Sequence, residues 1–83
     1  MRVARDALDP QKSKEREYAA DRFAFENGHY EGLRSNFQKM WDEMAPKQQA
    51  LARKREKYRT HPTFENRVNA LDALQAGTAS KSP

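Results

Sequence analysis

The sequence predicts an all-α fold, a small bundle of three to four short helices. Residues that favour strands are scarce, because valine, isoleucine and threonine together number five and isoleucine is absent. Alanine, leucine, glutamate, lysine, arginine, glutamine and methionine, which favour helices, make up much of the remainder. The 83 residues allow one domain, and we expect an N-terminal arm at 1–9, a helical domain at 10–76 and a flexible tail at 77–83.

The first helix is predicted near residues 10–26. Asp9–Pro10 is typical of an N-cap followed by the first helical residue, and Asn27–Gly28 offers the left-handed backbone conformation that ends many helices. Phe23 and Phe25 fall on different sides of this helix. We therefore expect neighbours to contact the helix from two directions.

The second predicted helix, near residues 29–44, has the clearest apolar face in the chain. Six apolar residues fall within about 100 degrees of a helix with 3.6 residues per turn: Tyr30, Leu33, Phe37, Met40, Trp41 and Met44. This segment is expected to be the main core helix.

The segment from Phe25 to Met40 resembles the turn and second helix of a tetratricopeptide repeat. The glycine, tyrosine, small, aromatic and small positions of that repeat correspond here to Gly28, Tyr30, Leu33, Phe37 and Met40. The resemblance implies that the first two helices form an antiparallel αα-hairpin. No second copy follows, so we take it as evidence for the hairpin and not for family membership.

Two further helices are predicted, near residues 46–59 and 62–76. Pro46 suits a first helical turn, Thr60–Pro62 interrupts the helical pattern, and Gly77 is expected to end the last helix. The residues expected to supply the core and contact surface of the bundle are Tyr18, Phe23, Phe25, Tyr30, Leu33, Phe37, Met40, Trp41, Met44, Leu51, Phe64, Val68, Leu71 and Leu74.

The positive charge of the chain is concentrated between Lys47 and Arg59. This window holds six basic residues and one acid, Glu56, while the other 70 residues hold ten basic and eleven acidic ones. Such a segment favours an anionic partner. The candidate residues for binding nucleic acid or an acidic partner are Lys47, Arg53, Lys54, Arg55, Lys57, Tyr58 and Arg59.

The basic segment allows several interpretations. It can be a solvated outer helix whose long side chains cover a thin apolar stripe of Leu51 and Tyr58. It can also follow a phosphate backbone, with Tyr58 stacked on an exposed base. An acidic protein groove or an anionic membrane surface are the remaining possibilities.

Catalytic motifs are not recognisable in the sequence. Cysteine is absent, and His29 and His61 do not lie at a metal-ligand spacing from each other. There is no glycine-rich phosphate loop, no nucleophile elbow and no His-Glu-x-x-His motif. Glu15 and Glu17 are expected to be solvated, because residues two apart do not share a helix face. We therefore predict no enzyme activity, no catalytic residue, no metal, no cofactor and no small-molecule substrate.

The location of the protein is predicted from its apolar runs. The longest run is three residues, far below the roughly 20 that span a bilayer, and residues 1–15 lack the apolar centre of a signal peptide. We expect a cytoplasmic or virion-associated protein that is not secreted.

The leading functional prediction is a non-catalytic interaction protein. It would be a small basic helical component of a larger assembly, such as a virion or nucleoprotein complex, and would contact an acidic partner or a nucleic-acid backbone. One alternative is a free-standing nucleic-acid-binding regulator. Another is a small inhibitor that blocks a partner enzyme by occupying its surface.

Overall fold

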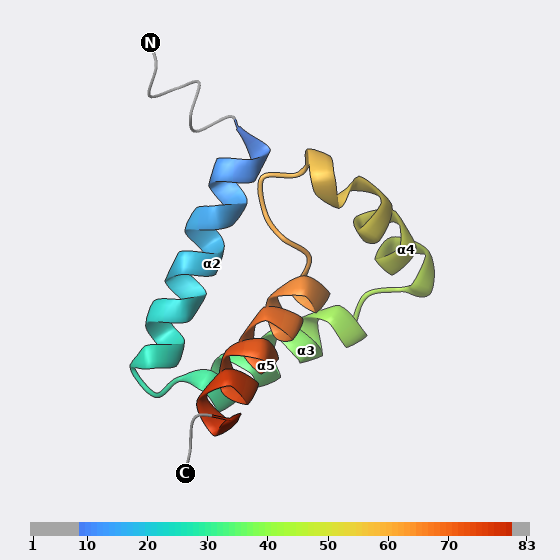
Figure 1. The fold of residues 1–83 in the computed structure, drawn as a ribbon. Coiled ribbons are helices and arrows are strands. Elements are labelled where there is room, and N and C mark those ends of the chain that lie inside the picture. The colour runs from blue at the N-terminus through green and yellow to red at the C-terminus, as the bar shows by residue number, and fades with distance from the viewer. Residues whose placement is uncertain (1–8, 81–83) are drawn as a thin grey trace.

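The computed structural model describes residues 9–80 as helices joined by short loops (Figure 1). The elements are α2 (Pro10–Glu26), α3 (Tyr30–Asp42), α4 (Pro46–Arg55), the 3-10 turn η1 (Glu56–Tyr58) and α5 (Phe64–Ser80). No strand occurs within this described part of the chain. The prediction of a small all-α bundle is confirmed.

Helix α2 begins and ends where the sequence predicted. The Asp9 carboxylate accepts hydrogen bonds from the backbone N–H groups of Gln11 and Lys12, at 2.9 and 3.3 Å, and so caps the helix. At the other end Gly28 has a φ of 86°, a conformation that costs glycine little because it has no Cβ. The turn therefore redirects the chain into α3.

The core forms mainly between α3 and α5, which cross in Figure 1. Phe37, Val68 and Leu71 are its buried centre. The partly buried side chains that pack against this centre are Phe25, Tyr30, Leu33 and Phe64. Trp41, at the end of α3, is also buried, with 6% of its surface exposed, as its central place in the apolar arc predicted.

Some of the residues expected to supply the core and contact surface of the bundle are exposed. Phe23 is 68% exposed, and Met40 and Leu51 are each 41% exposed. The predicted apolar stripe of Leu51 and Tyr58 does not form, since Tyr58 is 71% exposed and the small side chain of Ala52 is the buried one in α4. Helix α4 therefore approaches the bundle on a different face from the one that the helical wheel indicated.

The later helix boundaries also differ from the prediction. The basic helix ends at Arg55 and continues only as the turn η1. Helix α5 begins at Phe64, where the Thr63 hydroxyl accepts a hydrogen bond from the backbone N–H of Asn66 at 3.0 Å. It passes through Gly77 to Ser80, because Gly77 does not take the left-handed conformation that ends a helix.

Two of the predicted segments fall at the chain ends. Residues 1–8 of the expected arm and residues 81–83 of the expected tail lie outside the described residues. Within the described range, none of the helices has the length and apolar character needed to cross a membrane.

Polar contacts join segments that are distant in sequence. The Lys14 ammonium is buried and donates hydrogen bonds to the backbone carbonyl of Glu56 at 2.9 Å and to its carboxylate at 3.3 Å. Arg34 donates two hydrogen bonds to Asp72, at 2.7 and 3.1 Å. These contacts hold η1 against α2 and α3 against α5.

Candidate functional site

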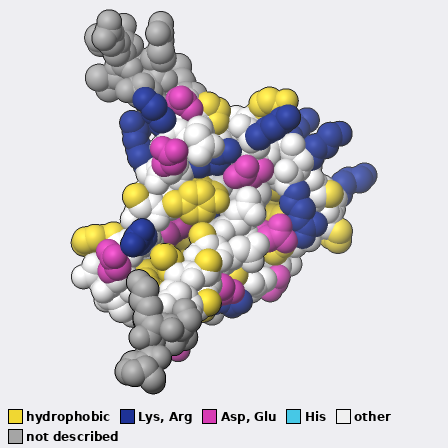
Figure 2. All heavy atoms as spheres, in the orientation of Figure 1, with side chains coloured by type: hydrophobic (Ala, Val, Ile, Leu, Met, Phe, Trp, Pro, Cys, Tyr) yellow, Lys and Arg dark blue, Asp and Glu magenta, His cyan; other side chains and the backbone are white. Residues whose placement is uncertain are grey.

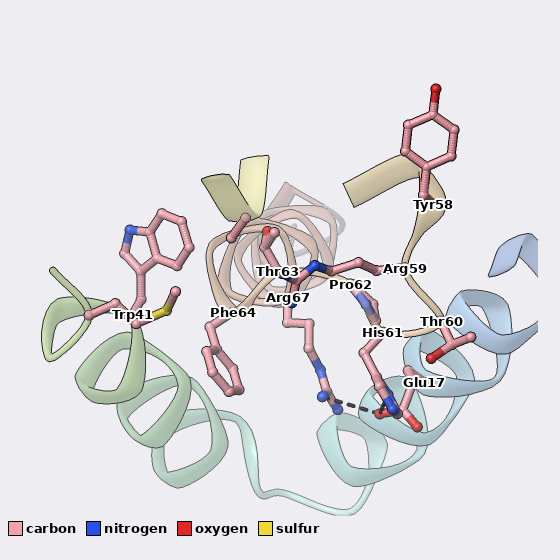
Figure 3. Close-up of a pocket in the computed structure, with 12 residues that line it drawn as sticks. Glu17, Trp41, Tyr58, Arg59, Thr60, His61, Pro62, Thr63, Phe64 and Arg67 are labelled. Carbon is pink, nitrogen blue, oxygen red and sulfur yellow. Dashed lines mark ion pairs between the residues drawn. The ribbon is translucent and has the colours of Figure 1, made fainter. Parts of the chain in front are cut away.

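A pocket of about 720 Å³ is lined by the segment 59–63 together with residues of α2, α3, α4 and the start of α5 (Figure 3). One end is apolar and is formed by Trp41, Met44 and Phe64. The other end is polar and contains Glu17, His61 and Arg67. Figure 3 shows Trp41 and Glu17 at opposite ends, with Phe64 and Arg67 between them. The pocket thus combines an apolar surface with a charged one.

Arg67 is the residue that organises the polar end. Its Nε and Nη2 atoms donate hydrogen bonds to the two Asp21 carboxylate oxygens at 2.8 and 2.7 Å, and its Nη1 lies 3.2 Å from Glu17 Oε2. The Asp21 hydrogen bonds raise the pKa of Arg67 above its ordinary value. The guanidinium also lies 4.2 Å from the centroid of the Phe37 ring. These contacts fix Arg67, and Arg67 in turn positions Glu17.

Glu17 and Asp21 reach Arg67 together because of the helical period. They are four residues apart on α2, so their side chains project from the same face. Asp21 is turned inward and only 6% of its side chain is exposed, whereas the Glu17 side chain is 34% exposed. Asp21 therefore anchors the guanidinium while Glu17 faces the pocket.

His61 completes the polar end. Its Nδ1 atom lies 3.8 Å from Glu17 Oε2, and its side chain is 72% exposed. A carboxylate and an imidazole thus lie side by side at the mouth of the pocket, two groups that serve in proton transfer and metal binding. Sequence reasoning missed both groups, since Glu17 was expected to be solvated and His61 was not expected to bind a metal.

The sequence holds only a partial signal for this site. The spacing of Glu17 and Asp21 indicates a shared carboxylate face on a helix. Nothing local links that face to Arg67, which is 46 residues beyond Asp21. The cluster could therefore be found only with the tertiary structure in hand.

The side chains at the polar end of the pocket include types that bind metal ions. A catalytic zinc ion takes three protein ligands, with a water molecule in the fourth position. The pocket brings together two side chains of the required types, Glu17 and His61. Among residues 9–80, no three histidine, cysteine, aspartate or glutamate side chains are grouped so that they could hold a metal ion. The described residues thus do not complete a catalytic metal site.

The predicted basic residues are only partly brought together. A groove of about 510 Å³ is lined by Lys54, Arg55, Lys57, Tyr58 and Arg59. Arg53 lies outside it and donates hydrogen bonds to Glu65 at 2.9 and 2.7 Å, with its guanidinium 5.1 Å from the Trp41 ring centroid. Lys47 is exposed in the first turn of α4 and does not line the groove.

The family of the chain was established by comparison with known proteins. No curated protein and no solved structure matched it. One family model, that of Peptidase family M48, matches residues 3–75. Peptidases are catalysts, so the predictions that the protein is not an enzyme and that it is a non-catalytic assembly component are wrong, as are the two non-catalytic alternatives. Since the match spans most of the sequence, the chain belongs to Peptidase family M48.

Proposed function

We propose that the chain takes part in peptide-bond hydrolysis, with the pocket between Trp41 and Glu17 as the place where the substrate peptide lies. The observation that carries this proposal is the placement of Glu17. Among the described residues that line the pocket it is the one carboxylate, and Arg67 holds it beside His61. Carboxylates serve peptide hydrolysis either by accepting a proton from water or by binding a metal ion.

The shape of the pocket suits a peptide. Its volume of about 720 Å³ lies within the range of roughly 300 to 1,000 Å³ found for ligand sites. An apolar side chain of the peptide would contact Trp41, Met44 and Phe64, and the neighbouring amide would lie toward Glu17. Binding of this kind orients the peptide bond relative to the carboxylate, which is one source of rate enhancement.

The family comprises metallopeptidases, and the described side chains do not fit a complete catalytic metal site. Many such enzymes take two ligands from a helical His-Glu-x-x-His motif, which this sequence does not contain. We therefore assign no step through a metal to these residues. Their contribution is to bind the peptide and to hold Glu17 next to it, while a full catalytic centre needs groups in addition to those described.

The proposal is tested by kinetics of the complete gene product on a mixed peptide library, with products identified by mass spectrometry. Glu17→Gln keeps the size of the side chain but removes its ability to accept a proton as a base. We expect kcat to fall by about 100-fold or more, with little change in KM. The matched control is Glu31→Gln, an exposed carboxylate on α3 outside the pocket, which should leave both constants unchanged.

Two results would overturn the proposal. One is a Glu17→Gln variant that hydrolyses peptides at the parent rate. The other is a set of NMR spectra in which peptides shift neither the Trp41 indole nor the His61 imidazole resonances, because these groups line opposite ends of the pocket.

A further inference from the structure

A cationic groove adjoins the pocket. Lys54, Arg55 and Lys57 line it, and Tyr58 and Arg59 line both the groove and the pocket. The two cavities therefore share a wall formed by η1 and the residue that follows it. A ligand held in the pocket therefore lies next to the cations of the groove.

Most cations of the groove have no acidic partner among residues 9–80. Within the described part of the chain no ion pair joins Lys54, Arg55 or Arg59 to an acid. The Lys57 ammonium lies 5.0 Å from the centroid of the Tyr58 ring. Figure 2 shows Lys and Arg side chains projecting from the edge of the molecule formed by α4. The groove thus presents several cations that form no ion pair with an acid in the described part of the chain.

The one acid of the basic segment is directed away from the groove. Glu56 lies between Arg55 and Lys57 in sequence, but its carboxylate is 3.3 Å from the buried Lys14 ammonium, on the side of α2. The pairing leaves the Glu56 side chain only 22% exposed and offsets its charge with that of Lys14. The fold therefore increases the positive potential that the sequence already indicated.

We propose that this groove binds an acidic stretch of the substrate peptide, so that peptides with aspartate or glutamate beside the apolar residue held at Trp41 are preferred. The inference rests on the proposed function. A polypeptide is favoured over a nucleic acid because the groove adjoins the proposed peptide pocket, with Tyr58 and Arg59 lining both. Complementary charge of this kind gives selectivity and faster association.

The test uses two fluorescent peptides that share an apolar anchor and differ only in four flanking residues, glutamate in one and glutamine in the other. Binding to the complete gene product is measured at 50 and 300 mM salt. We expect the acidic peptide to bind about tenfold more tightly at low salt. The advantage should largely disappear at high salt, since charges at an exposed surface are screened.

Matched variants identify the cations that are responsible. Changing Lys54 and Lys57 to glutamine should remove most of the preference for the acidic peptide over the glutamine peptide. Changing Lys39 and Lys47 to glutamine removes the same charge from exposed positions outside both cavities, and the preference should persist.

The outcomes separate this inference from the function on which it rests. If neither peptide binds, the proposed peptide pocket is wrong. If both bind equally, or if the two double variants lose the preference to the same extent, the pocket stands and the acidic selectivity is wrong. A single-stranded oligonucleotide provides a further check. The selectivity is also wrong if the oligonucleotide binds the groove more tightly than the acidic peptide does and, when added in competition, does not displace the glutamine peptide from the pocket.

Discussion

The guanidinium of Arg67 makes two hydrogen bonds to the buried carboxylate of Asp21, at 2.7 and 2.8 Å, and so joins α5 to α2. The same guanidinium lies 3.2 Å from Glu17, the carboxylate at the mouth of the pocket. The geometry of the pocket and the stability of the fold consequently depend on one ion-pair cluster.

The first prediction concerns Asp21. Asp21→Asn leaves Arg67 with a weaker partner in a mostly buried position, and breaking a buried ion pair costs about 3 kcal/mol. We expect the free energy of unfolding, measured by urea denaturation, to fall by about that amount. The control is Glu26→Gln, whose exposed pair with Arg22 should contribute below about 0.5 kcal/mol. Equal effects of the two changes would show that Asp21 does not anchor the helices.

The second prediction concerns Trp41. Trp41→Ala removes a large side chain that is 6% exposed, and such a change costs about 3 to 5 kcal/mol. Most of the chain should be unfolded at 37 °C, as read from the helical circular dichroism signal. Leu51→Ala, at a position that is 41% exposed, should cost far less. An unchanged melting curve for Trp41→Ala would mean that the indole does not support the fold.

The third prediction contrasts two glycines. Gly28 has a φ of 86°, so Gly28→Ala should destabilise the protein by about 1 kcal/mol. Gly77 lies within α5, and an added Cβ would meet no atom within 4 Å apart from its chain neighbours and the backbone of its own helix, so Gly77→Ala should stabilise the protein by roughly 0.5 to 1 kcal/mol. Thermal melts should show a lower melting temperature than the parent for Gly28→Ala and a higher one for Gly77→Ala. A destabilising Gly77→Ala would contradict the continuation of α5 through this residue.

The fourth prediction is a loss of stability in acid. Hydrogen bonds from Arg34 lower the pKa of Asp72 below its ordinary value of 3.8, and hydrogen bonds from Arg53 lower the pKa of Glu65 below 4.5. The unfolded chain therefore takes up these protons at a higher pH than the folded chain does. The contribution of both groups is complete above their ordinary pKa values, declines as the pH falls below them, and is fully lost only when the pH has fallen through the lowered pKa values of the folded state.

Urea midpoints at pH 6 and pH 3.5 measure this effect. In a variant with Arg34 and Arg53 both changed to glutamine, the midpoint should fall less between the two pH values than in the parent. Lys39→Gln, which removes an exposed charge elsewhere on α3, should leave the parent's pH dependence intact. A double variant as acid-sensitive as the parent would exclude a contribution from these two carboxylates.

The fold was largely predictable because its signals are local. The cap at Asp9 and the left-handed Gly28 bound α2 as expected. The apolar arc around Trp41 correctly identified α3 as a core helix. The end of α5 was not predictable in the same way. A glycine such as Gly77 ends a helix only if its backbone adopts the left-handed conformation. Whether it does so depends on how the helix packs against the rest of the chain.

The sequence by itself determined the helical class, the main core helix and the concentration of positive charge near residues 47–59. Only the tertiary structure decided which charges face solvent and which form a site. It turned Glu56 inward to Lys14 and brought Arg67 to Glu17 and Asp21 across two helices. Helical periodicity tells which residues share a face but not which distant face they meet. That choice follows from how the apolar surfaces of α2, α3 and α5 pack together.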